Sequence, residues 1–271
     1  MSEPFFHFFG LSESPFSKEI PDSDLWLPPS KLALVDELCE AVRERAQVLL
    51  IGEPGAGKTC VLRAVRHRLP QAGFRLTYCH NATLGRRDFY RQLSQTLGIL
   101  PSTTAAAVFY AITAHVENLG RERIHPVFLL DEAHLLHQDT LDHLHILLNY
   151  EWDSRALLSL ILVGLSDLKD RLELRKNRAL YSRIERRLSV GPMTRDDTGE
   201  YVRMRLLRAG GDREIFTADA LASLHEAAGS SLREIDRVST AALRETAKRK
   251  KKLVERDVMA HIVGALEIDS G

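Results

Sequence analysis

A glycine-rich segment followed by a lysine and a threonine, Gly52–Thr59, carries the clearest chemistry in the sequence. Its order of glycine, four residues, glycine, lysine and threonine is typical of a phosphate-binding loop. The glycines let backbone N–H groups curl around phosphate oxygens, because no Cβ is in the way. Lys58 can reach the β- and γ-phosphates of a nucleotide, and Thr59 can place its hydroxyl on Mg²⁺. The residues predicted to bind the nucleotide at this loop are Gly52, Glu53, Pro54, Gly55, Ala56, Gly57, Lys58, Thr59 and Cys60.

An acidic pair, Asp131 and Glu132, directly follows the apolar run 127–130. Such a run predicts a buried parallel strand that delivers its last residues to the carboxyl edge of a sheet. Beside a phosphate loop, Asp131 would hold Mg²⁺ through water, and Glu132 would polarise the attacking water. The letters Asp-Glu-Ala-His also spell a helicase motif. Those helicases need two tandem motor domains, for which the remaining chain is too short.

Two more polar groups are candidates for contact with the nucleotide. After the apolar run 157–163 the chain continues with Leu165 and Ser166, at a place where a phosphate-loop ATPase offers a polar group to the γ-phosphate. Ser166 can serve in this role, whereas Leu165 cannot. Arg233 follows the start of a C-terminal helix, where a lid can direct it back to the phosphates.

The segment 171–187 is strongly basic. It has three interpretations: a solvated helix face, a phosphate-binding patch, or an arginine finger donated to the nucleotide of a neighbouring subunit. The candidate finger residues are Arg183, Arg186 and Arg187.

The elements that must position these residues follow from periodicity and from turn residues. Strands are expected at 47–51, 74–78, 127–130, 157–163 and 188–190. Helices are expected at 30–45, 58–69, 86–97, 104–119, 194–209, 217–228, 231–250 and 255–264. Gly191 and Pro192 break the chain, so we expect a domain boundary there, between a core at 30–192 and a helical lid at 193–271.

The first 29 residues are rich in phenylalanine and proline, which predicts an extended arm without a long helix. Its aromatic residues favour burial, either on the core, on a neighbouring subunit, or over the adenine. At the other end, the basic run 248–252 is either a nucleic-acid patch or a solvated helix end. Five histidines between 125 and 145 lack the spacing of a metal site.

Composition limits the class of protein. The 271 residues are 44% apolar and 27% charged, which is ordinary for a globular protein. Lys+Arg and Asp+Glu are both 37, so no net charge attracts the chain to nucleic acid. The three cysteines have no paired spacing, which favours a reducing compartment. No apolar run is long enough to span a membrane, and the N-terminus lacks the basic residues of a signal peptide. We therefore expect a cytoplasmic protein.

The order of phosphate loop, acidic strand, basic segment and helical lid resembles that of the AAA+ ATPases. It resembles more closely the ExeA-type ATPases and the TniB/TnsC-type and MuB-like ATPases of DNA transposition. The segments that carry this resemblance are Phe9-Gly10-Leu11 with Pro15-Phe16, Leu147–Glu151, Leu160–Gly164 and Gly229–Ile235.

The resemblance implies an α/β fold: an AAA+ P-loop three-layer core with a five-stranded parallel sheet, followed by a small all-helical lid. It also implies homo-oligomers, as rings or helical filaments, with ATP and Mg²⁺ between subunits and an arginine finger from the basic segment. One departure concerns Leu165, because the family usually carries Gly-Gln-Pro-Glu-Leu where this sequence has Gly164–Leu168. This departure leaves the rate of hydrolysis open.

In the transposition relatives, the segment after the second strand faces the pore of the ring. The corresponding residues here are Arg86, Arg87, Arg91, Thr103 and Thr104. Arginines can neutralise DNA phosphates, and threonines and helix N-terminal amides can bond phosphate oxygens. The alternative is that these arginines are merely solvated.

Three functions remain in competition. The first is an ATP-dependent, largely sequence-nonspecific DNA-binding ATPase that oligomerises on double-stranded target DNA and recruits or regulates a transposase or target-selection protein. The second is an ExeA-like ATPase that assists assembly of a secretion machine. The ExeA form carries a transmembrane segment and a wall-binding domain after the ATPase, which this sequence lacks, so the first function is favoured. The third is an ATP-dependent switch with protein partners only.

Overall fold

The computed structural model describes residues 5–79, 83–100, 104–150, 155–211 and 214–269. The chain forms two compact units. The sheet unit comprises Lys31–Glu53 and Lys58–Val190, and the helical unit comprises Met1–Ser30, Pro54–Gly57 and Gly191–Gly271. The first 30 residues thus group with the C-terminal helices. The division into an arm, a core and a lid stays a prediction.

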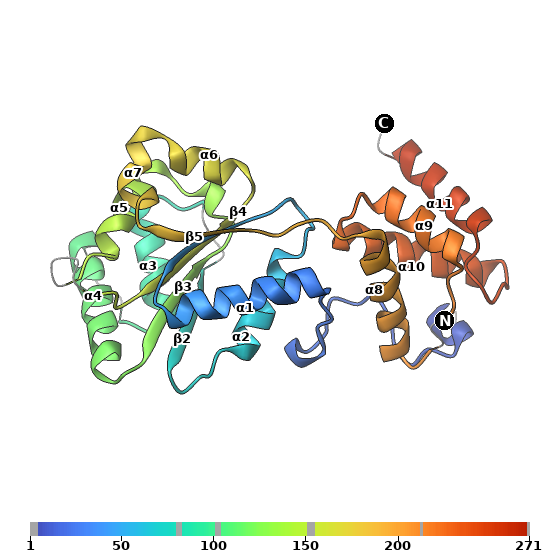
Figure 1. Ribbon diagram of the computed structural model, residues 1–271, viewed down its shortest axis with the longest axis horizontal. Coiled ribbons are helices and arrows are strands. Elements are labelled where there is room, and N and C mark those ends of the chain that lie inside the picture. Colours follow the sequence, from blue (N-terminus) through green and yellow to red (C-terminus); the bar gives the residue numbers. More distant parts are fainter. Residues whose placement is uncertain (1–4, 80–82, 101–103, 151–154, 212–213, 270–271) are drawn as a thin grey trace. The chain divides into compact units, whose positions relative to one another are not determined.

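A five-stranded, all-parallel sheet forms the centre of the sheet unit (Figure 1). Its strands are β1 (Gln47–Ile51), β2 (Phe74–Cys79), β3 (His125–Leu130), β4 (Ser159–Gly164) and β5 (Ile184–Ser189). Their order in the sheet is β2-β3-β4-β1-β5. The three inner strands are almost entirely buried, as their continuous apolar runs predict. The predicted bounds of β1 agree with the structure, and those of β2, β3 and β4 differ by one or two residues at their ends.

The fifth strand begins earlier than the sequence indicates. We expected it at 188–190, but β5 spans Ile184–Ser189. Only Ile184 and Leu188 are buried in it, because β5 is an edge strand and its other side chains reach solvent. An apolar run therefore does not mark the start of this strand.

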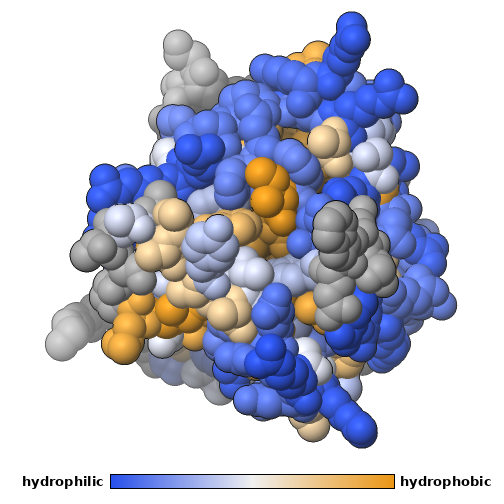
Figure 2. Space-filling model, turned by 90° about the vertical axis from the view of Figure 1, so that its left-hand side faces the viewer, coloured by the Kyte–Doolittle hydropathy of each residue, from blue (hydrophilic) through white to orange (hydrophobic). Residues whose placement is uncertain are grey.

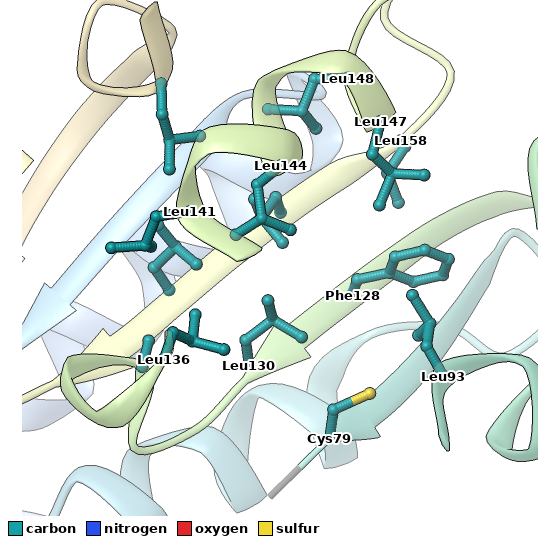
Figure 3. Packing of buried hydrophobic residues seen from close by; sticks show 14 of the residues in the cluster. Cys79, Leu93, Phe128, Leu130, Leu136, Leu141, Leu144, Leu147, Leu148 and Leu158 are labelled. Carbon is teal, nitrogen blue, oxygen red and sulfur yellow. The ribbon is translucent and has the colours of Figure 1, made fainter. Parts of the chain in front are cut away.

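Helices lie on both sides of the sheet. One face is covered by α3 (Arg86–Thr96), α4 (Ala105–Arg121) and α5 (Gln138–Leu147), together with the short α6 (Asp167–Glu173) and α7 (Arg178–Tyr181). Figure 3 shows leucines of α5 packing toward Phe128 and Leu130 of β3. Helices α1 (Pro29–Arg43) and α2 (Lys58–Arg68) lie together, apart from this group (Figure 1).

Helices α8 (Arg195–Arg208), α9 (Ala218–Ala228), α10 (Leu232–Lys248) and α11 (Arg256–Asp269) form the helical unit. Threonine side chains cap the starts of α8 and α9. The side chain of Thr194 accepts the N–H of Asp197 in a capping box, and that of Thr217 accepts the N–H of Ala220. Gly229 ends α9 with a left-handed backbone (φ 53°), which favours glycine.

The N-terminal arm packs on the core of the helical unit. Leu11 and Phe16 are members of that core, and Phe5, Phe9 and Trp26 pack against it. The expected packing on the core at 30–192 was therefore wrong, because the aromatic residues of the arm are buried on the C-terminal helices of the same chain.

The surface of the sheet unit on the side of α4 is mixed in character. Figure 2 shows an apolar area surrounded by hydrophilic residues on this side. Among the described residues of this part of the chain, Leu100, Tyr110 and Ile146 expose much of their side chains. In the parts of the chain that the structure describes, no helix is both long enough and apolar enough to span a membrane.

Candidate nucleotide-binding site

The phosphate loop connects β1 to α2. Gly55 (φ 79°) and Gly57 (φ 97°) have left-handed backbones that a side chain would strain. A Cβ on Gly52 would lie 3.1 Å from Val190. Lys58 is buried, and its Nζ donates to the carbonyl oxygens of Gly52 at 2.7 Å and Glu53 at 3.2 Å. The loop thus curls around the lysine ammonium, and Lys58 is bound by two of its backbone carbonyl oxygens.

The acidic pair lies where the apolar run predicts, at the carboxyl end of β3. Asp131 is buried, and its Oδ1 accepts the N–H of Glu132 at 2.9 Å. Glu132 has a left-handed backbone (φ 53°) and an exposed side chain, and its Oε2 lies 3.6 Å from Nε2 of His134. A left-handed backbone in a residue other than glycine costs about 1–3 kcal/mol, and such residues cluster at functional sites. Asp131 therefore points into the protein, while the carboxylate of Glu132 faces solvent.

The end of β4 lies between these two groups, because β4 separates β3 from β1 in the sheet. The N–H of Gly52 donates to the carbonyl oxygen of Gly164 at 3.2 Å. A Cβ on Gly164 would meet Leu168 at 2.8 Å and the backbone nitrogen of His134 at 3.3 Å. This close packing brings the phosphate loop, the end of β4 and the acidic pair to one edge of the sheet.

Ser166 lies at this edge, but its hydroxyl has a protein partner. Its Oγ donates to Oε1 of Glu53 at 2.6 Å. The side chains of Ser166 and Glu53 therefore join the end of β4 to the phosphate loop. Contact of Ser166 with a γ-phosphate stays a prediction.

The three finger candidates differ in position. Arg183 directly precedes β5, whereas Arg186 and Arg187 lie inside β5, so our expectation that all three precede the last strand was wrong for these two. Arg186 donates to Glu44 at 2.7 Å, and this hydrogen bond raises the pKa of Arg186. The guanidinium of Arg187 lies 4.4 Å from the ring centre of Tyr181. Because the strands are parallel, Arg183 is at the sheet edge opposite the phosphate loop.

Arg233 lies in the first turn of α10 and is exposed. Ser231 caps this helix by accepting the N–H of Glu234 at 3.5 Å. Within the helical unit, the N–H of Leu232 donates to the carbonyl oxygen of Gly55 at 2.9 Å. The role of Arg233 toward a phosphate stays a prediction.

The predicted DNA-binding residues lie at the starts of two successive helices. Arg86 and Arg87 are exposed in the first turn of α3, and Arg91 lies 3.9 Å from Asp88 one turn later. Thr104 caps α4 by accepting the N–H of Ala107 at 3.2 Å. Thr103 lies outside the described residues.

The basic run 248–252 is largely engaged within the helical unit. Arg249 and Lys251 form ion pairs with Glu245, Glu255 and Asp257. Lys252 donates to the carbonyl oxygen of Phe8 at 3.0 Å and lies over its ring. These contacts favour the solvated helix end over a nucleic-acid patch.

No sequence motif marks Tyr78, which lies beside the acidic pair. Tyr78, near the end of β2, donates its hydroxyl to Oδ2 of Asp131 at 2.7 Å. Strand β2 pairs with β3, and Tyr78 lies beside Leu129 in the register. Only the order of strands reveals this neighbour, because 53 residues separate Tyr78 from Asp131 in the sequence.

Comparisons with known proteins agree with this geometry. Residues 41–172 match the family model of an AAA domain. General secretion pathway protein A of Aeromonas hydrophila is 33% identical over 240 residues, which are 87% of this chain and 44% of that protein. The chain thus spans less than half the length of this relative.

Solved structures share the fold. Cdc6p of Pyrobaculum aerophilum matches with a TM-score of 0.69 at 17% identity, over 89% of this chain and 67% of that chain. The Aeropyrum pernix ORC1 protein, solved in complex with DNA, matches with 0.67 at 20% identity, over 92% and 69%. The RuvB Holliday junction branch migration motor of Thermotoga maritima matches with 0.55 at 16% identity, over 88% and 68%. The predicted α/β fold class, with its five-stranded parallel sheet and helices, is confirmed, and residues 41–172 of the chain match an AAA domain.

Proposed function

We propose that this chain binds ATP with Mg²⁺ at the edge formed by the phosphate loop and the acidic pair, and hydrolyses it there. One observation carries the proposal: Lys58 and Asp131 follow strands β1 and β3 at the same edge of a parallel sheet, joined by the packed end of β4. The left-handed glycines of the loop and the buried lysine fit a bound phosphate, since the two carbonyl partners of Lys58 can be exchanged for phosphate oxygens.

Each residue would have a distinct role. Lys58 would offset the charge of the β- and γ-phosphates, and Thr59 and Asp131 would hold Mg²⁺, which neutralises charge on the phosphates. The exposed carboxylate of Glu132 would orient the attacking water. Ser166 and Arg233 would contact the nucleotide from the end of β4 and from α10.

Assembly would complete the site. In the AAA+ resemblance, a neighbouring subunit supplies an arginine to the γ-phosphate. Arg183 suits this role best of the three candidates, because it directly precedes β5 at the sheet edge opposite the phosphate loop, whereas Arg186 and Arg187 lie inside the strand. We therefore propose a homo-oligomer with ATP at its subunit contacts.

The partner of this assembly would be double-stranded DNA, and its task would be to recruit or regulate a transposase or target-selection protein. The DNA proposal is supported by the exposed Arg86 and Arg87 in the first turn of α3, because arginines and helix N-termini can both bind DNA phosphates. It is also supported by the likeness of the fold to an ORC1 protein solved with DNA. The transposition partner rests on the resemblance in sequence to the TniB/TnsC-type group.

A gel-shift titration of duplex DNA, with and without a non-hydrolysable ATP analogue, tests this function. We expect binding that depends on the analogue, is insensitive to sequence, and weakens steeply with salt. A variant with Arg86→Ala and Arg87→Ala should bind more weakly, with a salt slope reduced by about 2. The control variant, Arg121→Ala with Lys169→Ala, removes the same charge from exposed sites elsewhere in the sheet unit. Equal binding by both variants would refute the placement.

A second candidate is ATP-dependent assembly of a secretion machine. The observation that favours it is the 33% identity to General secretion pathway protein A. In that case the nucleotide would be hydrolysed at the same site, but duplex DNA would neither bind nor change the rate. An ATP-dependent switch with protein partners only would behave in the same way toward DNA, so the gel shift separates the DNA function from both alternatives.

A further inference from the structure

Tyr78 of β2 is bound to Asp131, the first residue of the acidic pair. Its hydroxyl donates to Oδ2 of Asp131 at 2.7 Å, and its side chain is 43% exposed. The other oxygen of the same carboxylate, Oδ1, accepts the N–H of Glu132 at 2.9 Å. The backbone N–H of Asp131 donates to Cys79, the residue next to Tyr78, at 2.9 Å. The carboxylate is thus held at two points, by the hydroxyl of Tyr78 and by the N–H of Glu132, and the backbone of Asp131 is held by β2.

This arrangement fixes the direction of the carboxylate. Each carboxylate oxygen can accept about two hydrogen bonds, so the contacts made by the described residues leave one acceptor site on each oxygen of Asp131. A carboxylate held by the Glu132 amide alone could turn about its last torsion, which is broad for aspartate. The Tyr78 hydroxyl removes this freedom, so the remaining acceptor sites keep one orientation.

The Tyr78 hydroxyl is the donor in its contact with Asp131. Burial, the hydrogen bond to Asp131 and the negative charges of Asp131 and Glu132 all raise the pKa of Tyr78.

We propose that Tyr78 is a positioning residue of the magnesium site: its hydroxyl holds the carboxylate of Asp131 in the orientation that would bind the water shell of the ion. The inference rests on the proposed function, because it needs Asp131 to serve Mg²⁺. It assigns to an exposed tyrosine on the neighbouring strand a task that the phosphate-loop and acidic-strand motifs do not contain. Its effect should appear in the metal dependence and not in the affinity for nucleotide alone.

The test is Tyr78→Phe, which removes one oxygen and keeps the ring. Two readouts are needed. The first is Mn²⁺ binding in the presence of a non-hydrolysable ATP analogue, measured by electron paramagnetic resonance. The second is the Mg²⁺ concentration that half-saturates ATPase activity. We expect both to weaken about tenfold, since hydrogen bonds to charged groups are among the strong ones. In EDTA, which removes the metal, the affinity for a fluorescent ATP analogue should be the same for Tyr78→Phe as for the wild type. Tyr110→Phe, at an exposed tyrosine of α4, is the matched control and should leave every readout unchanged.

A double-mutant cycle shows whether Tyr78 acts through Asp131. In an Asp131→Asn background, Tyr78→Phe should produce no further loss of Mn²⁺ affinity. An equal loss in both backgrounds would overturn the inference, as would a Tyr78→Phe protein with the metal dependence of the wild type. A wild-type chain that binds no nucleotide would instead refute the proposed function itself. Thermal unfolding of each variant checks that the fold is retained.

Discussion

Lys58 in the sheet unit and Arg205 in the helical unit are both buried cations that donate to backbone carbonyl oxygens. They differ in how far along the sequence these carbonyls lie. Lys58 donates to carbonyl oxygens five and six residues before it in the sequence. Arg205 donates to the carbonyl oxygen of Pro15 at 2.6 Å and to that of Ser17, which lie 190 and 188 residues away. It also donates to the hydroxyl of Tyr201 at 3.0 Å.

This difference separates a binding group from a structural one. The partners of Lys58 belong to a loop whose backbone suits an anion, so a phosphate can replace them. The partners of Arg205 tie the N-terminal arm to α8, and the guanidinium packs against the rings of Phe16 and Tyr201. Removing Lys58 should therefore abolish chemistry and spare the fold, whereas removing Arg205 should destabilise the fold first.

The largest expected effect is at the phosphate loop. Lys58→Ala should lose ATP binding by at least a hundredfold, because the phosphate charge loses its main cation. Glu132→Gln should keep ATP binding and lose turnover, because only the carboxylate that orients water is changed. Fluorescent-nucleotide binding and phosphate release measure the two quantities. Turnover by Glu132→Gln at the wild-type rate would contradict the role of that residue.

The next effect concerns assembly. A finger supplied in trans accelerates hydrolysis about a thousandfold or more in well-studied cases, so Arg183→Ala should lose most of its activity. Mixed with Lys58→Ala, which is also inactive, it should regain activity, because some interfaces then pair an intact loop with an intact Arg183. Activity of the wild type should rise faster than linearly with protein concentration. If the two variants sediment as one assembly but the mixture stays inactive, Arg183 acts on the nucleotide of its own subunit or is not an arginine finger.

Features that depend on neighbouring residues in the sequence could be predicted, whereas features that depend on distant segments could not. The bounds of β1 and the place of Asp131 were predicted correctly, because each depends on an apolar run followed by polar residues with their own motif. The start of β5 was not, because an edge strand keeps Arg186 and Arg187 at the surface. Tyr78 and Arg205 were missed, since the partners of both depend on strand order or on packing of distant segments.

A smaller effect, on stability, tests the structural cation. Arg205→Leu should destabilise the helical unit by about 3 kcal/mol, because carbonyl oxygens of the arm lose their donors. Hydrogen–deuterium exchange should speed up in peptides of α8 and of the arm, and not in those of α5. Arg237→Ala is the control in the same unit, since its exposed pair with Glu234 contributes at most about 1 kcal/mol. If exchange in Arg205→Leu rises equally in the sheet unit and in the helical unit, Arg205 does not specifically stabilise the contact between the arm and α8.

The smallest effect concerns a buried histidine of the sheet unit. His125 is buried, contacts Ser159 at 2.9 Å, and has its pKa lowered to about 4, chiefly by burial and also by the charge of Arg45. An unfolded histidine has a pKa near 6.5. As the pH falls below 6.5, His125 therefore becomes protonated in the unfolded chain but stays neutral in the folded chain until the pH approaches about 4. Stability should thus be unaffected above pH 7, decrease between about 6.5 and 4, and reach a constant penalty below that range.

At pH 5 this loss should amount to about 1–2 kcal/mol after allowance for solvent screening. Acidic and basic groups elsewhere also titrate, so the measured quantity is the difference between the wild type and His125→Gln, which cannot take up the proton. Exchange protection of β3 and β4 amides at pH 7.5 and 5 gives that difference for the sheet unit alone. The wild type should lose more protection than the variant, and the helical unit should show no such difference. Equal losses in both proteins would mean that His125 is protonated in the folded state as readily as in the unfolded one.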